Sequence, residues 1–415
     1  MAGAADFEGR RALVLGVANK RSIAWGIARQ LAAGGARLAF TYQGERIEKS
    51  VRELAESVDA ALVTECDVRS DDDVARVFAE TADAFGGELD ILVHSVAFAA
   101  AEDLEGRFTD TPRDRFWMAV DISAYSLVAC ARAAEPLMEK AGGGSIVTMT
   151  YLGGERAVPH YNVMGVAKAT LDSSVRYLAW DLGRKNIRVN AISAGPVRTL
   201  AARSIAGFPT MEAIVEERAP LHRHGLGRSR QDGDERRRAG QKRDEAAQLS
   251  LRLADARGRR DRIAPMAGAF TGKRALVLGV ANKRSIAWAI AQQLADGGAR
   301  LAFTYQGERI EQSVRDLAAT VDTALVTECD VRSDEDIARV FDEVGSAFDG
   351  GLDLLVHSVA FAAAEDLEGR FTDTPRDRFW LALDVSAYSL VACARAAEPL
   401  MESAGGGSIV TMTYL

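Results

Sequence analysis

A tyrosine and a lysine stand seven positions apart in the stretch "PHYNVMGVAK", residues 159–168. Seven residues make about two turns of an α-helix, so Tyr161 and Lys168 are predicted to face the same side. An ammonium beside a phenol favours the phenolate and lowers the pKa of the tyrosine, which improves it as a proton donor or oxyanion partner. An isolated pair of this kind is more often a tyrosine anchored in the core beside a solvated lysine. Its meaning therefore depends on what surrounds the helix.

The stretch "LGVANKRSIAWGIA" contains a glycine turn that could bind phosphate. Gly16 follows an apolar run, Ser22 comes six residues later, and Gly26 lies within the next helical pattern. The glycine allows a tight turn, and the following helix offers free N–H groups and the positive end of its dipole. Ser22 is predicted to be either the helix N-cap or a hydroxyl donor to a pyrophosphate. The spacing is not G-x-G-x-x-G, so an ordinary strand–turn–helix remains the alternative at this point.

Candidate ligand-binding residues also follow the third and fourth strand-like runs. Asp67 and Val68 end "TECDV", and Val96 and Ala99 lie in "HSVAF". In an open parallel sheet, ligands bind beyond the carboxyl ends of the strands, so these motifs are predicted to meet in one crevice. Asp67 has the alternative role of capping the next helix.

The second strand-like run ends at Gln43, where an acidic residue often holds an adenosine ribose. Arg46 follows and offers a partner to a 2′-phosphate. This pattern leaves the choice between NADH and NADPH open.

Strand-like and helix-like segments alternate along the chain. The strand-like runs are "RRALVLGVA", "RLAFTYQ", "ALVTECDV", "LDILVHSVA", "GGSIVTMTY" and "NIRVNAISAG". Such alternation predicts an α/β fold, a Rossmann-like doubly wound parallel sheet with helices on both faces. The catalytic pair would then lie on the helix after the fifth strand.

Most of this pattern occurs twice. Residues 7–152 and 270–415 align without a gap and differ at 23 of 146 positions. A period of this length indicates duplication of a whole domain. We expect one nearly complete copy with six strands, residues 1–220, and a second, truncated copy with five, residues 266–415. The second copy is expected to lack the Tyr-x6-Lys pair.

Residues 221–265 have a different composition. They contain 12 Arg and 1 Lys against 7 Asp plus Glu, and no Phe, Trp, Tyr or Val. Such a segment buries too little apolar surface to offset its ordering entropy, which predicts a disordered linker. The abrupt shift in composition also suggests a translated seam left by a frameshift or gene fusion.

The overall composition is that of a cytoplasmic protein with no membrane segment and no nucleic acid partner. Hydrophobic residues make up 48% and charged residues 27% of the chain, and the net charge is −8. No apolar run approaches the ~20 residues that a bilayer requires. The cysteines at 66, 130, 329 and 393 are predicted to be buried free thiols. No metal-ligand spacing is present, and His94 and His160 are predicted to be packing or surface residues.

The motifs together resemble one family. Gly16, Ser22 and Gly26, with "YLGGERAVPHYNVMGVAK" and "NAISAGPVRTLAA", are similar to the enoyl-acyl-carrier-protein reductases, a divergent branch of the short-chain dehydrogenase/reductases. Most short-chain dehydrogenases have a Y-x3-K pair and a serine 17 positions before the lysine. Here that position holds Tyr151, and Y-x6-K replaces Y-x3-K. The resemblance covers about residues 5–220 and, for the N-terminal part only, 266–415.

The resemblance implies NADH-dependent reduction of the 2,3 double bond of a trans-2-enoyl thioester in fatty acid elongation. Tyr161 would hydrogen-bond the thioester carbonyl, Lys168 would hold the nicotinamide ribose, Tyr151 would line the acyl pocket and Ala99 would touch substrate. The dinucleotide would be contacted by Gly16, Ser22, Ile23, Gln43, Asp67, Val68, Val96, Lys168, Val197 and Thr199. The implied partner is acyl carrier protein, and the implied assembly is a homo-oligomer, a tetramer in the family.

The chain departs from the family after about Pro220, where the last helix and strand are not found in the first copy. Three alternatives to a working enoyl reductase follow: a dinucleotide-binding pseudoenzyme, an inactive truncated gene product that exposes sheet edges and aggregates, and a ketone-reducing short-chain dehydrogenase.

Overall fold

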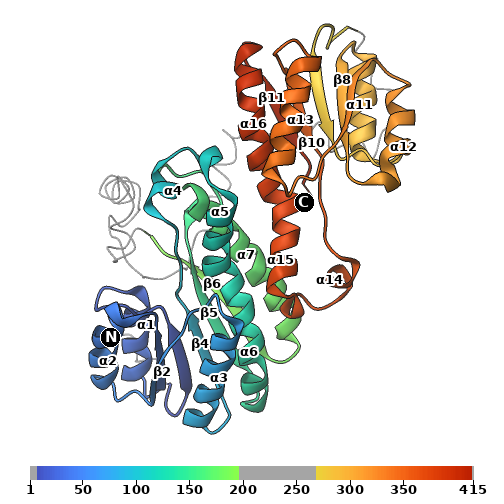
Figure 1. Cartoon of the computed structure of the whole chain (residues 1–415). Coiled ribbons are helices and arrows are strands. Elements are labelled where there is room, and N and C mark those ends of the chain that lie inside the picture. Colours follow the sequence, from blue (N-terminus) through green and yellow to red (C-terminus); the bar gives the residue numbers. More distant parts are fainter. Residues whose placement is uncertain (1–6, 196–267, 414–415) are drawn as a thin grey trace, which may run out of the picture. The chain divides into compact units, whose positions relative to one another are not determined.

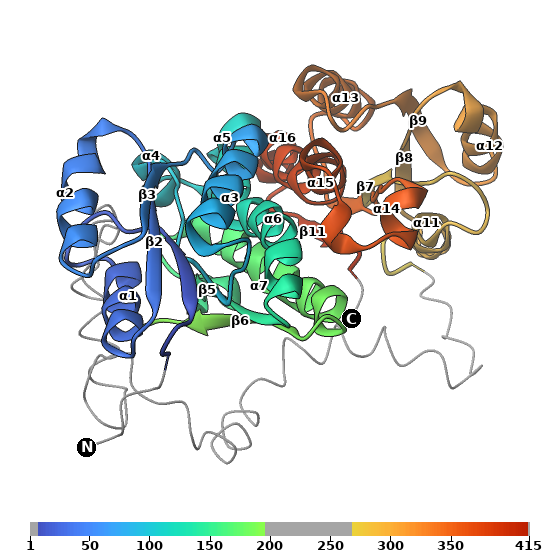
Figure 2. The same cartoon turned by 90° about the horizontal axis from the view of Figure 1, so that it is seen from below.

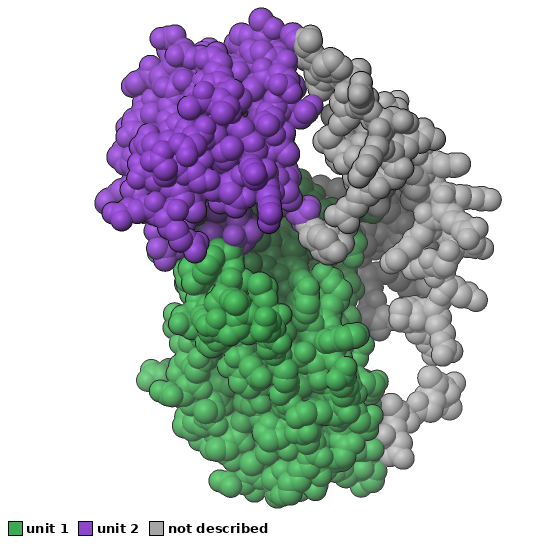
Figure 3. Space-filling model, turned by 90° about the vertical axis from the view of Figure 1, so that its right-hand side faces the viewer, with its two compact units in different colours: residues 1–225, 361–384 green, residues 226–360, 385–415 purple. Residues whose placement is uncertain are grey.

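The computed structural model describes residues 7–195 and 268–413. The predicted linker, 221–265, lies outside the described residues. The chain divides into two compact units (Figure 3): the first is Met1–Gly225 with Phe361–Asp384, and the second is Leu226–Ala360 with Val385–Leu415. The predicted domain boundaries stay a prediction. One segment of the second copy, residues 361–384, thus belongs to the first unit.

The first unit contains a six-stranded parallel sheet in the order β3-β2-β1-β4-β5-β6 (Figure 1). The strand order reverses between β1 and β4, which is where such sheets bind their ligands. The strands are β1 (Arg11–Leu15), β2 (Arg37–Tyr42), β3 (Leu62–Glu65), β4 (Ile91–His94), β5 (Gly144–Thr150) and β6 (Ile187–Ser193). The predicted α/β fold and the six strands of the first copy are confirmed.

Helices cover both faces of this sheet. Figure 2 shows α1 and α2 on one side of β2 and β3, and α3 and α6 on the other. The helical elements of the first copy are α1 (Ile23–Ala33), α2 (Glu45–Glu56), α3 (Asp71–Phe85), α4 (Ala101–Glu105), η1 (Phe108–Asp110), α5 (Arg113–Val120), η2 (Asp121–Tyr125), α6 (Ser126–Lys140), η3 (Leu152–Gly154) and α7 (Asn162–Gly183). The predicted alternation of strand and helix is therefore present.

Local sequence explains where these helices begin and end. Ser70 caps α3 by accepting a hydrogen bond from the Asp73 N–H, and three acidic residues occupy the first turn, where the helix dipole favours negative charge. Gly86 ends α3 in the left-handed conformation with φ 71°, which glycine adopts without a steric penalty. The start and the end of α3 are thus fixed by residues next to it in the sequence, Ser70 and Gly86.

The core between β1, β2, α1 and α2 is apolar. Trp25 and Phe40 pack with ring centroids 6.2 Å apart, and Leu38, Val51 and Leu31 are buried around them. Burial of such side chains contributes about 1.5–3 kcal/mol each. This packing anchors the ends of β1 and β2, from which the loops with the candidate site residues leave.

The second unit contains a five-stranded parallel sheet in the order β11-β10-β7-β8-β9. Its strands are β7 (Arg274–Leu278), β8 (Arg300–Tyr305), β9 (Thr323–Glu328), β10 (Leu354–His357) and β11 (Ser408–Thr411). All four residues of β11 are exposed, including Ile409 and Val410. The five strands predicted for the second copy are confirmed.

The remaining elements of the second copy repeat those of the first. They are α11 (Ile286–Asp296), α12 (Glu308–Ala318), α13 (Asp334–Ala347), α14 (Ala364–Glu368), η7 (Phe371–Asp373), α15 (Arg376–Leu383), η8 (Asp384–Tyr388) and α16 (Ser389–Ser403). The helical stretch Arg376–Ser403 is long and apolar enough to cross a membrane by length and composition, and 44% of its most apolar window is buried. The corresponding stretch of the first copy is α5, η2 and α6, and α6 contacts β5 and β6 of the sheet.

The four cysteines are free and buried, as predicted. Burial raises the pKa of the Cys66 thiol to about 12 and also raises the pKa of Cys130. Because the thiolate is the reactive form, these side chains are packing groups.

Candidate active site

The candidate residues follow consecutive strands along one edge of the first sheet. The strand order places the residues after β3, β2, β1, β4 and β5 side by side. In that order they are Asp67 and Val68, Gln43, Gly16 and Ser22, Val96 and Ala99, and Tyr151. All strands run parallel, so their carboxyl ends form one edge. The loops that carry the predicted residues therefore leave the sheet along one edge, and their role in ligand binding stays a prediction.

Gly16 holds the loops after β1 and β4 together. Its φ is +95°, and an added Cβ would lie 2.0 Å from the Ser95 backbone oxygen. No other residue fits such a contact. The tight approach occurs where the strand order reverses, between β1 and β4, which is the position where sheets of this type bind their ligands.

Ser22 occupies the N-cap position of α1, but its side chain does not cap the helix. Its hydroxyl oxygen accepts hydrogen bonds from the backbone N–H groups of Ala18, at 3.0 Å, and Asn19, at 3.1 Å. The hydroxyl hydrogen remains available to an acceptor outside the loop, as the predicted pyrophosphate role requires. Ile23 follows as the first residue of α1 and is partly buried.

Asp67 does not cap a helix, because Ser70 has that role. The Asp67 carboxylate instead accepts hydrogen bonds from Arg69, which hold its pKa below the ordinary value. The neighbouring Val68 is buried, and Gln43 is exposed at the end of β2. Beside Gln43, the Gly44 N–H donates to Glu65 Oε1 at 3.1 Å, so a carboxylate borders this turn.

The two predicted tyrosines lie against each other. Their ring centroids are 5.0 Å apart at 62°, an edge-to-face arrangement. Tyr161 is 8% exposed and is the residue before α7, while Tyr151 directly precedes η3 and is half-buried. Within the described residues, neither hydroxyl forms a hydrogen bond, so both can meet a ligand.

The backbone on either side of Tyr161 is unusual. His160 has φ 61° and Asn162 has φ 20°, values that non-glycine residues adopt at a cost of order 1–3 kcal/mol. The Asn162 side chain donates to the Gly106 backbone oxygen, which ties the start of α7 to the loop after α4. The chain therefore fixes the position of Tyr161 from both sides.

Lys168 lies on α7 and is buried, and its ammonium donates to the Met149 backbone oxygen of β5 at 2.8 Å. Burial lowers the pKa of Lys168 to about 8, and the nearby Asp172 carboxylate opposes that shift. A lysine held this way is not a solvated surface residue. Its ammonium lies at the end of β5, next to the backbone of Met149, two residues before Tyr151.

The predicted lowering of the Tyr161 pKa is wrong. Burial raises the pKa of Tyr161 above its ordinary value, with a smaller contribution from Tyr151, and Lys168 is engaged by Met149. Desolvation of the phenol dominates, and no charge effect of Lys168 offsets it. Tyr161 is therefore a protonated donor across the physiological range, which suits it to binding an oxyanion.

Three glycines that the sequence argument did not use shape this corner. An added Cβ on Gly153 would lie 2.4 Å from the Tyr161 ring, one on Gly154 would lie 2.9 Å from Asp172 Oδ2, and one on Gly165 would lie 2.8 Å from the Gly153 backbone oxygen. The turn η3 can pack flush against α7 only because side chains are missing there. The double glycine after Tyr151 was the signal available in the sequence.

His94 belongs to the core. Its ring nitrogens pair with Thr148 Oγ1 at 3.0 Å and Ser126 Oγ at 2.8 Å, and burial lowers its pKa to about 3. Among residues 7–195 and 268–413, no group of three or more His, Cys, Asp or Glu side chains is arranged to hold a metal ion.

Four further predicted residues remain. Val96 and Ala99 follow β4 and are partly buried at the same edge as Tyr151, next to the exposed Phe98. Val197 and Thr199 lie outside the described residues.

The residues at this edge suit a dinucleotide. The glycine turn, the N-terminus of α1 and the Ser22 hydroxyl offer donors for phosphates, and Gln43 and Asp67 follow β2 and β3, which lie on one side of β1. The buried Lys168 and the two tyrosines follow on the other side of the strand reversal. Binding of a nicotinamide beside Tyr161 is consistent with this order.

Comparison with known proteins gives a consistent result. The family model described as enoyl-(acyl carrier protein) reductase matches residues 16–229 and again 279–415. The enoyl-[acyl-carrier-protein] reductase [NADH] FabI of Bacillus subtilis is 56% identical over 220 residues, which are 52% of this chain and 84% of that protein. The NADPH enzyme FabI of Staphylococcus aureus strain MRSA252 is 51% identical over 221 residues, 53% of this chain and 85% of that protein.

Solved structures agree with the sequence comparison. The Bacillus cereus enoyl-acyl carrier protein reductase, solved with NADP+ and indole naphthyridinone, matches with a TM-score of 0.51 and 52% identity, over 52% of this chain and 84% of that one. The family model covers most of both copies, and it matches the chain in two segments because the chain is a partial tandem duplication. The chain therefore belongs to the enoyl-(acyl carrier protein) reductase family.

Proposed function

We propose that the first copy catalyses NADH-dependent reduction of the 2,3 double bond of a trans-2-enoyl thioester carried by acyl carrier protein, as in fatty acid elongation. Two observations carry the proposal: the buried Tyr161 packs against the half-buried Tyr151, and the buried Lys168 on the same helix binds the end of β5 in a dinucleotide-type sheet. The family membership supports the reaction class. We further propose that the chain acts in the cytoplasm and self-associates, as the family resemblance implies.

In the proposed reaction, each side chain has a separate task. A bound reduced nicotinamide would supply a hydride to the β-carbon of the conjugated thioester. Negative charge then moves to the thioester oxygen, where the Tyr161 hydroxyl donates a hydrogen bond and stabilises the enolate. A proton returns to the α-carbon, ultimately from water. Lys168 would hold the nicotinamide ribose, and Tyr151 would contact the acyl chain.

The apolar surface at this edge fits an acyl chain. Phe98 is 47% exposed and Leu152 is 42% exposed, and they follow the neighbouring strands β4 and β5. Large exposed apolar side chains at a candidate site favour an apolar ligand. They support an enoyl thioester as the substrate over a small polar ketone.

The test is a direct absorbance assay that follows NADH consumption by the full chain. We expect NADH consumption with crotonyl-CoA and faster consumption with longer 2-enoyl thioesters, but none with an acetoacetyl thioester. Consumption with the acetoacetyl thioester alone would identify a ketone reductase. NADH binding without turnover of any thioester would identify a pseudoenzyme, and insoluble or molten protein an inactive gene product.

Replacing Gly153 by alanine is expected to lower kcat about 100-fold with little change in the Kd for NADH. The added methyl group would lie 2.4 Å from the Tyr161 ring and 3.3 Å from Tyr151, so the phenol must move. A displacement of about 1 Å at a reacting group can cost about 100-fold. The matched control is Gly183→Ala, at the end of α7, where an added Cβ meets nothing within 4 Å. Equal kcat for the two variants would contradict the proposed position of Tyr161.

NADH is expected to be preferred over NADPH. Glu65, bonded to the Gly44 N–H beside Gln43, places a negative charge next to the turn that would receive the adenosine ribose. Glu65→Gln should improve the kcat/KM ratio for NADPH over NADH about fivefold, the effect of about 1 kcal/mol between charges in a hydrated site. Glu53→Gln on α2 serves as a control of equal charge change. A ratio unaffected by Glu65→Gln would show that this carboxylate does not choose the cofactor.

A further inference from the structure

The first unit includes a segment that does not belong to the first copy. Residues 361–384, with α14, η7 and α15, come from the second copy and lie in the first unit. They contact the surface formed by α5, η2, α6 and the C-terminal half of α7, which we call the helical face.

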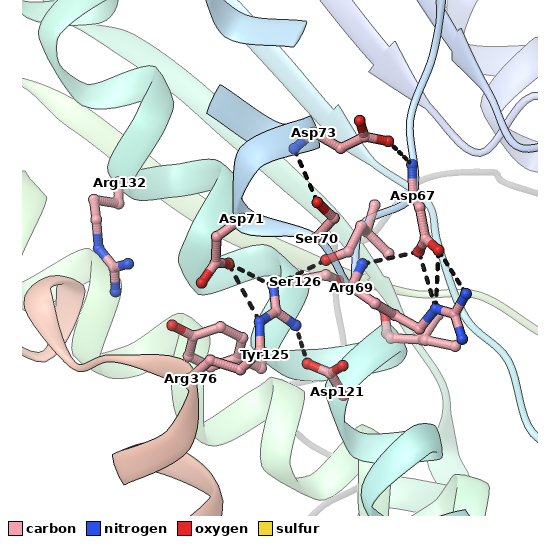
Figure 4. A network of polar contacts seen from close by, with 12 residues as sticks. Asp67, Arg69, Ser70, Asp71, Asp73, Asp121, Tyr125, Ser126, Arg132 and Arg376 are labelled. Carbon is pink, nitrogen blue, oxygen red and sulfur yellow. Dashed lines mark hydrogen bonds and ion pairs between the residues drawn. The ribbon is translucent and has the colours of Figure 1, made fainter. Parts of the chain in front are cut away.

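Arg376 is the most engaged residue of this segment. Its guanidinium binds Asp71 at 2.7 Å and the Val68 backbone oxygen at 3.0 Å, forms an ion pair with Asp121, and lies 4.6 Å from the centre of the Tyr125 ring (Figure 4). Asp121 is buried, and burial raises its pKa to about 6 against the opposing effect of Arg376. Loss of this partner would leave a buried carboxylate uncompensated.

Further polar contacts extend along η7. Arg370 binds both carboxylate oxygens of Glu135, at 2.7 and 2.8 Å. The Thr372 N–H and hydroxyl both donate to Asp181 at 2.9 Å, and Arg132 donates to the Thr372 backbone oxygen at 2.7 Å. The segment thus provides hydrogen-bond and ion-pair partners for Glu135, Asp181 and Arg132 of the helical face.

The contacts are reciprocal. The two copies are offset by 263 residues, so Arg376 is the equivalent of Arg113 and Asp384 is the equivalent of Asp121. Arg376 forms an ion pair with Asp121, and Arg113 forms one with Asp384. When residue i meets j′ and residue j meets i′, the surface is self-complementary, as in a two-fold interface between identical chains.

The centre of the contact obeys the same rule. Trp117 packs against Trp380, its own counterpart in the repeat, with ring centroids 4.7 Å apart and the ring planes tilted by 40°. A residue that meets its own copy marks the position of a two-fold axis. Residues 107–121 and 370–384 differ only at positions 118 and 120 of the first copy, where Met and Val become Leu and Leu. A second molecule would therefore present the same groups to this face.

We propose that the helical face is a homotypic pairing surface and that residues 370–384 fill it within the same chain, in place of a second molecule. The duplicated segment then acts as an internal subunit that supplies Arg376 to Asp121 and covers Trp117. Self-association of the chain must use a different face.

Cysteine crosslinking tests this directly on the full chain. In Trp117→Cys/Trp380→Cys, a short bismaleimide at micromolar protein should link the two positions within one chain, identified by mass spectrometry of the joined peptides in the monomer band. The parent chain is the control for its buried native thiols. Trp117→Cys alone should give no crosslinked dimer. A dimer from that single variant, or no crosslink in the double variant, would overturn the proposal.

A second pair of variants covers the case in which the cysteine variants fail to fold. Arg376→Gln should lower the Tm of the first unit by about 5 °C or more, because the buried Asp121 carboxylate then loses its ion-pair partner. The matched control is Arg378→Gln on the same helix, whose ion pairs with Glu365 and Asp366 lie inside the segment itself. Equal Tm values for Arg376→Gln and the parent chain would show that residues 370–384 do not fill the helical face.

Discussion

Tyr161→Phe is expected to lower kcat for enoyl thioester reduction by about 100- to 1,000-fold while leaving the Kd for NADH within about twofold of the parent value. Loss of one oxyanion donor in a buried site costs about 3–4 kcal/mol in the transition state. The ring of Tyr161 packs edge-on against Tyr151 and fills the space over Gly153, and phenylalanine keeps that packing. The fold should therefore survive the change.

The measurement is single-turnover reduction with NADH in excess, together with NADH fluorescence titration. Tyr177→Phe is the matched control, since Tyr177 lies further along the same helix and is 58% exposed. Parent-like turnover in Tyr161→Phe would exclude the phenol as the oxyanion donor. A matching loss in Tyr177→Phe would mean that the effect is not local to the site.

Lys168→Met is expected to weaken NADH binding by at least about 100-fold without destabilising the fold. Burial lowers the pKa of Lys168 to about 8 from 10.5, so the folded chain holds the ammonium at a cost on the order of 3 kcal/mol near pH 7. The variant removes that cost and also the hydrogen bond to the Met149 carbonyl, a loss of about 1–3 kcal/mol. The two effects offset each other, so Tm should stay within a few degrees of the parent value.

The same shift predicts a pH dependence with opposite signs for binding and stability. NADH affinity, which requires the ammonium, should fall as pH rises through about 8. The folded chain releases this proton at lower pH than the unfolded chain does, so the stability due to Lys168 rises between about pH 8 and pH 10.5. Fluorescence titrations and thermal melts over this range measure the two trends. A large drop in Tm for Lys168→Met would instead assign this lysine a structural role.

Much of the fold could be predicted because the signals are local. Apolar runs of strand length, Gly16 after β1 and the Asp-rich start of α3 identify their elements without tertiary information. The order of the loops along the sheet edge then followed from the parallel topology. The two roles predicted for Ser22, helix N-cap and hydroxyl donor to a pyrophosphate, could not be separated from the sequence because both place a hydroxyl at the start of α1. In the structure the side chain forms no cap and accepts hydrogen bonds from the Ala18 and Asn19 N–H groups instead.

Other features depend on burial and long-range contacts. The direction of the Tyr161 pKa shift reverses because desolvation outweighs any charge effect, and a sequence does not state how deeply a phenol is buried. The role of Gly153 depends on the approach of η3 to α7. The pairing of Arg376 with Asp121 joins residues 255 positions apart, and no periodicity indicates it.

The most direct test of the central claim uses NADH deuterated at the transferred position and a crotonyl thioester, with the product analysed by mass spectrometry. The account predicts a butyryl thioester that carries one deuterium at its β-carbon, formed by the full chain and nearly absent with Tyr161→Phe. Absence of deuterium at the β-carbon of the product, or equal deuterated butyryl product with and without the Tyr161 hydroxyl, would contradict it.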